Sequence, residues 1–167
     1  MQFLTLALLA TAAAASPMEK VFNLKTFDAT DPKFNNLYLS TYHVSPTISD
    51  AVLQGTKEAQ MFHYNNGTVV MDVKSPLKWE LELITVNEAE WNPVQVNVNA
   101  GAGGKGFSVP KTGLEGAKSQ EFGGWLACDW YHGVPQLFFL AKEYKADIPS
   151  TCSKVQLKPE YSVAQAQ

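Results

Sequence analysis

Short stretches in which apolar and polar residues alternate constrain the fold of this chain most strongly. The clearest runs from Val94 to Val98, where polar residues separate the valines, and clusters of glycine, proline or asparagine end most of these stretches. A period of two places alternate side chains on one face, which is typical of a half-buried β-strand. The sequence therefore predicts an all-β fold, a single antiparallel β-sandwich or β-barrel of about eight to ten strands.

The composition fits one such domain, predicted to span residues 22–161. Of the 167 residues, 46% are hydrophobic, which is enough for a sizeable core. Only 17% are charged and the net charge is -3, so there is no basic surface for a phosphate backbone. We therefore exclude nucleic acid as a partner.

The N-terminus has the pattern of a targeting segment. Residues 3–15 change from leucine-rich to alanine-rich, and Ala13 and Ala15 fit the A-x-A cleavage pattern of a signal peptide. The run is shorter than the ~20 apolar residues that a membrane span needs. We predict a signal peptide over residues 1–15, a short linker or propeptide over 16–21, a disordered tail over 162–167, and a secreted, extracellular protein that is either free or associated with the cell wall.

Cys128 and Cys152 are the only cysteines, an even number in a chain that is predicted to be exported. An oxidising compartment favours a disulfide between them. A zinc site or a nucleophilic cysteine would need a cluster of further cysteines and histidines, which the sequence lacks. We predict the disulfide and no metal.

The run of residues 122–139, FGGWLACDWYHGVPQLFF, is the most distinctive part of the chain. Its strand presents apolar residues at both parities, so both faces are predicted to be buried. A turn over residues 131–135 then leads to a second strand. Further on, residues 154–158, KVQLK, alternate between polar and apolar residues, and we expect an edge strand there because the lysines discourage edge-to-edge pairing.

Asn66 and Gly67 predict a tight hairpin turn, because both residue types tolerate the positive φ of a type I′ turn. With Thr68 they also form an N-x-[ST] sequon, which makes Asn66 a glycosylation candidate in an exported chain. An unmodified turn is the alternative.

Several weak motifs receive structural interpretations. Asp28 and Asp31 lack the spacing of a calcium loop and are expected to cap a turn. Glu80 and Glu82 share one strand face, where a solvated face is favoured over acid–base chemistry. Residues 101–106 match G-x-G-x-x-G, but no helical pattern follows, so we expect a flexible loop and no nucleotide. No cofactor is predicted.

His132 lies close to Asp129 in the sequence, and a carboxylate that orients a histidine is the arrangement of a general base. No motif marks a serine or cysteine nucleophile, and a structural histidine that closes the turn is favoured. A hydrolase that uses Asp129 and His132 is therefore the third functional hypothesis.

Three segments of the chain resemble a known family. The run GGWLACDWYHGVPQLFF, the early NNLYLSTYH followed by DAVL, and the closing CSKVQLKPEY are similar to small secreted proteins of filamentous fungi that are often labelled IgE-binding proteins. The resemblance covers roughly residues 22–161. It brings no catalytic residues, and some relatives elicit defence or hypersensitive responses in plants, which implies an apoplastic, effector-like role.

Two functional classes are favoured. The first is a non-catalytic secreted protein that a host perceives or that binds a host apoplastic protein or a cell-wall component. The alternative is a module that binds cell-wall polysaccharide, because exposed aromatic rings stack on sugar faces. In both cases a monomer is expected, and the candidate binding residues are Trp91, Trp125, Trp130, Tyr131 and His132.

Overall fold

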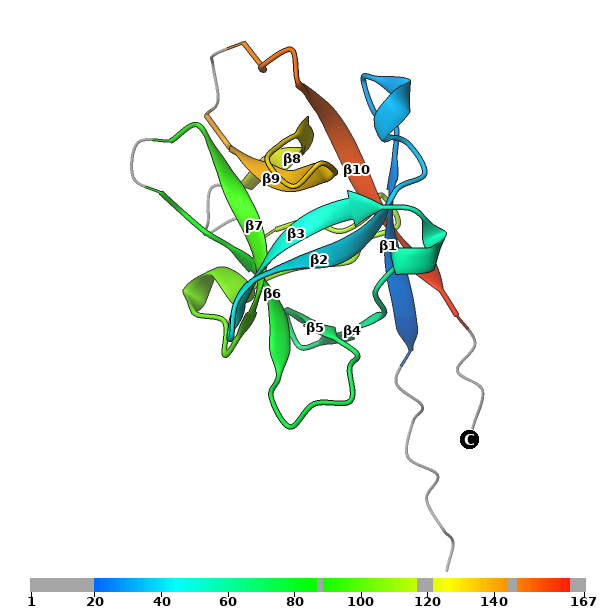
Figure 1. Ribbon diagram of the computed structural model, residues 1–167, viewed down its shortest axis with the longest axis vertical. Helices are drawn as coiled ribbons and strands as arrows, with labels where there is room; N and C mark the ends of the chain where they lie inside the picture. Colours follow the sequence, from blue (N-terminus) through cyan, green and yellow to red (C-terminus); the bar gives the residue numbers. More distant parts are fainter. Residues whose placement is uncertain (1–19, 87–88, 117–121, 144–146, 163–167) are drawn as a thin grey trace, which may run out of the picture.

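The computed structural model describes residues 20–86, 89–116, 122–143 and 147–162. Within them three short 3-10 helices, η1 (Pro32–Phe34), η2 (Thr56–Glu58) and η3 (Ala102–Gly104), accompany ten strands. The strands are β1 (Val21–Phe27), β2 (Tyr38–Ser45), β3 (Ile48–Gln54), β4 (Phe62–Asn65), β5 (Thr68–Met71), β6 (Trp79–Leu83), β7 (Trp91–Val98), β8 (Phe122–Asp129), β9 (Pro135–Ala141) and β10 (Cys152–Tyr161), as labelled in Figure 1.

The predicted segments at the two ends of the chain fall largely outside these residues. This applies to the signal peptide over 1–15, to residues 16–19 and to residues 163–167. Val21 lies in the segment predicted to be a linker, but it is the first residue of β1. Ser162, which was assigned to the tail, donates its N–H to the Val21 carbonyl at 3.1 Å, so the two ends of the domain are tied together.

The all-β prediction is confirmed, and of the two architectures the chain forms the antiparallel β-barrel. Hydrogen-bonded neighbours run in the order β10-β8-β9-β3-β2-β1-β4-β5-β6-β7. β1 also pairs with β10, and β7 pairs with both β3 and β9, so the sheet closes on itself. The first and last strands therefore lie side by side (Figure 1).

The prediction of an edge strand over residues 154–158 is wrong. β10 pairs with β8 through residues such as Lys154, opposite Leu126. On its other side the Lys154 carbonyl accepts the N–H of Thr30 at 3.0 Å, in continuation of the β1 ladder. The lysines alternate outward because β10 closes a barrel whose interior is apolar, and they do not protect a free edge.

The predicted disulfide between Cys128 and Cys152 is confirmed. The two residues are direct cross-strand partners in β8 and β10, and their Cα atoms lie 4.0 Å apart. The bond therefore links the last strand to its neighbour at the point where β10 begins.

Both faces of β8 are buried over residues 125–128, as predicted, whereas Gly123 and Asp129 near its ends are exposed. Trp125 and Ala127 point into the barrel interior, to which every described strand contributes apolar side chains. Leu126 and Cys128 point outward and belong to a second, smaller cluster on the outer wall with Phe138. The outer wall of the barrel is thus apolar where β8, β9 and the start of β7 meet.

The hairpin predicted at Asn66 and Gly67 is confirmed. β4 and β5 are joined by these two residues, with φ of 44° and 90°, and Asn65 lies opposite Thr68. Asp31 caps η1 by accepting the N–H of Lys33, as expected of a turn.

Two interpretations of local motifs are corrected. The glycine loop packs closely, because a Cβ on Gly103 would lie 2.2 Å from the Leu83 carbonyl oxygen. Glu80 does not lie on a solvated face, since it is buried and paired with Lys78. The close packing of Gly103 and the burial of Glu80 both depend on the backbone paths of η3 and β6. The spacing of residue types in the sequence does not reveal these paths.

The disulfide is expected to contribute substantially to stability. Replacing both cysteines, Cys128→Ala with Cys152→Ala, should lower the free energy of unfolding by about 3 kcal/mol, because the bond closes a loop of 24 residues in the unfolded chain. Denaturant titration measures the change, and the wild-type protein with its disulfide reduced serves as the matched control. An unchanged unfolding midpoint in both samples would contradict the expectation.

Candidate functional site

The outer-wall cluster carries a group of aromatic side chains next to the β8–β9 turn. Phe138 forms its base, with the rings of Trp91 and Trp130 at 4.9 and 5.2 Å between centroids. Tyr131 stands on Trp130 at 4.7 Å and is 85% exposed. The β8–β9 turn carries Trp130 and Tyr131, since Trp130 follows directly on the end of β8 and Gly133 adopts a φ of 71°, whereas Trp91 comes from β7 and Phe138 from β9.

A second set of side chains adjoins this group through His132. Its imidazole stacks on the Tyr42 ring at 3.9 Å between centroids and 19° between planes. His132 Nε2 lies 2.9 Å from Asp50 Oδ2, and Gln95 donates to the other oxygen of Asp50 at 3.0 Å.

Strand register explains why these residues meet. Asp50 of β3 lies opposite Tyr42 of β2 and opposite Gln95 of β7. We call Trp91, Trp130, Tyr131, His132 and Tyr42 together the aromatic surface.

The structure divides the residues that were predicted to form a binding site. Trp91, Trp130, Tyr131 and His132 lie on the aromatic surface, where the two tryptophans are half-buried. Trp125 does not, because it is only 3% exposed and its indole N–H donates to the Leu114 carbonyl at 2.7 Å inside the barrel.

Asp129 and His132 have different partners. Asp129 accepts a hydrogen bond from the Lys33 ammonium at 2.9 Å, and this bond raises the pKa of Lys33 above its ordinary value. His132 is bonded to Asp50 instead. The hydrolase hypothesis requires Asp129 to orient His132, and the structure shows no such contact between these described residues.

Sequence reasoning missed Asp50, Gln95 and Tyr42. Tyr42 is 90 positions before His132 in the sequence, and only the pairing of β2, β3 and β7 brings these residues together. No local motif could have indicated them.

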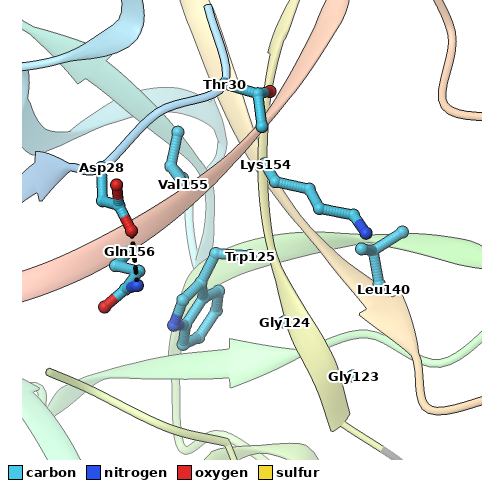
Figure 2. A pocket seen from close by; sticks show the side chains of 9 residues that line it. All are labelled: Asp28, Thr30, Gly123, Gly124, Trp125, Leu140, Lys154, Val155 and Gln156. Carbon is cyan, nitrogen blue, oxygen red and sulfur yellow. Dashed lines mark hydrogen bonds between the residues drawn. The ribbon is translucent and has the colours of Figure 1, made fainter. Parts of the chain in front are cut away.

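A shallow hollow of about 300 Å³ lies on the wall between β8 and β10 (Figure 2). The two strands separate beyond the pair of Trp125 and Val155, and the Leu157 carbonyl accepts a bond from Leu114 instead. Gly123 and Gly124 leave the wall bare there, since a Cβ on Gly124 would meet no atom within 4 Å.

Polar groups surround the hollow. Gln156 donates to the Asp28 carboxylate at 3.0 Å, and Thr30 and Lys154 line the other side (Figure 2). The edge of the Trp125 indole supplies an apolar flank. The hollow therefore combines a bare backbone floor with hydrogen-bonding side chains.

The described residues offer neither a cluster of metal ligands nor a membrane-spanning helix. They contain no group of three or more histidine, cysteine, aspartate or glutamate side chains arranged to hold a metal ion. None of their helices is long and apolar enough to cross a membrane.

The fold and these surfaces define a disulfide-bonded antiparallel β-barrel with an aromatic group on its outer wall. The chain belongs to the family described as a domain of unknown function (DUF7907), whose model matches residues 19–161. Neither a search of curated proteins nor a search of solved structures found a match.

Chemical modification tests the exposure of the aromatic surface. Brief treatment of the native protein with tetranitromethane should nitrate Tyr131 well before Tyr38, because Tyr131 is 85% exposed and Tyr38 is only 7% exposed. Peptide mass spectrometry over a time course measures the order, and unfolded protein is the control in which the tyrosines react alike. Equal rates for Tyr131 and Tyr38 in the native protein would contradict the described surface.

Proposed function

We propose that the chain is a secreted, non-catalytic interaction protein that binds a host or cell-wall component through the aromatic surface. The single observation that carries this proposal is the Tyr131 side chain, which is 85% exposed and packs on Trp130, which in turn contacts Trp91. Tyrosine and tryptophan are enriched among the residues that dominate binding energy at protein interfaces. The resemblance to fungal IgE-binding proteins supports an effector-like or elicitor-like role in the plant apoplast.

Ring geometry favours a protein partner over a polysaccharide. An extended polysaccharide presents successive sugar faces to a flat surface, so exposed rings that share one plane hold it best. Trp91 and Trp130 are inclined at 89° and Trp130 and Tyr131 at 57°. Tyr42 offers only one face, since His132 covers the other. Aromatic anchors at a protein interface fill separate pockets and need no common plane.

Other parts of the chain support export. Asn66 is exposed at the tip of the β4–β5 hairpin, where a glycan would extend into solvent. A disulfide that joins the neighbouring strands β8 and β10 also suits an oxidising compartment. A glycosylated, secreted protein is therefore part of the proposal.

Carbohydrate binding is the second candidate, and the hollow between β8 and β10 favours it. Asp28, Gln156 and Thr30 offer both donors and acceptors for hydroxyl groups around a floor of backbone. A volume of about 300 Å³ lies at the small end of ligand sites and suits a single sugar unit.

The test compares Tyr131→Ala with Tyr161→Ala in purified, endotoxin-free protein. Tyr161 is also exposed but lies at the far end of β10, so it is a matched control. Leaf infiltration and capture of apoplastic proteins are the two readouts. Tyr131→Ala should raise the concentration for a half-maximal response about tenfold, as expected when an aromatic anchor is lost, whereas Tyr161→Ala should match the wild type.

Two results would contradict the interaction-protein proposal. One is a response to the wild type no greater than to heat-inactivated protein across several plants. The other is an equal response to Tyr131→Ala and the wild type. Depletion from suspensions of chitin, β-glucan or cellulose that is lost in Gln156→Ala but retained in Tyr131→Ala would replace it with carbohydrate binding at the hollow.

A further inference from the structure

Thr41, Tyr42 and His43 of β2 form a sheet edge in the described part of the chain, because β3 pairs with only one side of them. β2 pairs with β3 over its whole length, but on its other side it pairs with β1 only at Tyr38. Among the described residues no strand pairs with Thr41, Tyr42 or His43 on that side. The edge strand is also exposed, with Tyr42 at 45% and Val44 at 53%.

The direction of the free backbone groups follows from the bonds of the preceding residues. The Leu37 carbonyl accepts the N–H of Thr26 at 2.8 Å, and the Leu39 carbonyl accepts the N–H of Gln60 at 3.0 Å. Backbone groups alternate in direction along a strand, so Thr41 and His43 direct their N–H and C=O groups to the same open side. A bulge between His43 and Ser45 ends the regular edge.

This edge has no charged or proline residue to oppose pairing, so its protection is limited to its short length and to the bulge after His43. Natural edge strands carry lysine, proline or inward-pointing charges that prevent edge-to-edge association. Residues 41–45, TYHVS, contain no lysine, arginine, aspartate, glutamate or proline. An antiparallel copy of the same strand would therefore meet no like charge and would supply the missing donors and acceptors.

We propose that two copies of the chain associate through this edge as an isologous antiparallel pair. Thr41 of one protomer pairs with His43 of its partner, and His43 with the partner's Thr41, so that the free N–H and C=O groups of both residues are satisfied in both copies. The two-fold axis then passes beside Tyr42, and the Tyr42 side chains of the two protomers face each other as a cross-strand pair. This assembly departs from the monomer expected from the sequence.

The pairing has a consequence for recognition. Tyr42 is part of the aromatic surface through its stacking on His132. The two-fold axis therefore places both copies of that surface on one assembly, and a partner with two epitopes would gain avidity. The regular edge is short and buries less than a standard interface, so the dimer is weak and depends on concentration.

The first experiment removes one outward N–H. His43→Pro deletes a donor that points away from β3 and leaves the β2–β3 ladder intact, and proline is accepted on strand edges. His43→Ala keeps the N–H and is the matched control. Sedimentation equilibrium of the secreted chain over a wide concentration range should show a dimer for the wild type and His43→Ala, and a dissociation constant at least about tenfold weaker for His43→Pro, since lost edge hydrogen bonds are worth about 1 kcal/mol each.

The second experiment tests the register and does not depend on the folding of the proline variant. Tyr42→Cys should form an intermolecular disulfide under mild oxidation, because directly opposed residues of antiparallel strands bring sulfurs into bonding range, as Cys128 and Cys152 do within this chain. Val44→Cys, which has no copy of itself opposite, should cross-link several-fold more slowly.

Three results would overturn the proposal. They are a monomer at every concentration, equal dimerisation of His43→Pro and His43→Ala, or equal cross-linking of the two cysteine variants. None of these results bears on the Tyr131 comparison, so the dimer and the proposed function can fail separately.

Discussion

The closure of the barrel by β10 is the constraint on which the rest of the structure depends. The last strand inserts between β1 and β8, so contacts between opposite ends of the sequence complete the sheet. The Cys128–Cys152 bond fixes that insertion at the first residue of β10. Without the insertion of β10, the hydrogen-bonding edges of β1 and β8 that face it would both be open.

Closure also determines where the aromatic surface lies. The interior of the barrel takes Trp125 and Ala127 from β8, which leaves Leu126, Cys128 and Trp130 on the outer wall. There they form one cluster with Phe138 and Trp91, and the β8–β9 turn carries Tyr131 beyond them into solvent. An apolar outer wall that ends in an exposed tyrosine is suited to recognition of another molecule.

Local chemistry predicted the parts of this fold that depend on neighbouring residues. Alternating runs indicated the strands. Asn66 and Gly67 indicated the hairpin, and the pair of cysteines indicated the disulfide. The prediction of an edge strand at residues 154–158 was wrong because lysines in alternate positions do not distinguish an edge strand from a strand that is paired on both sides. Both kinds of strand can have a solvated outer face. Partners that require long-range register, such as Asp50 with His132 or Lys33 with Asp129, have no local signal, so the candidate site was only partly predictable.

Hydrogen exchange of the backbone amides tests the central claim, that β10 is an integral strand of a closed barrel. With the disulfide intact, the paired amides of β10 should exchange as slowly as those of β1 and β8, because all three open only on global unfolding. Exchange of β10 amides that is orders of magnitude faster than that of β8 would show that β10 behaves as a frayed edge and would contradict barrel closure.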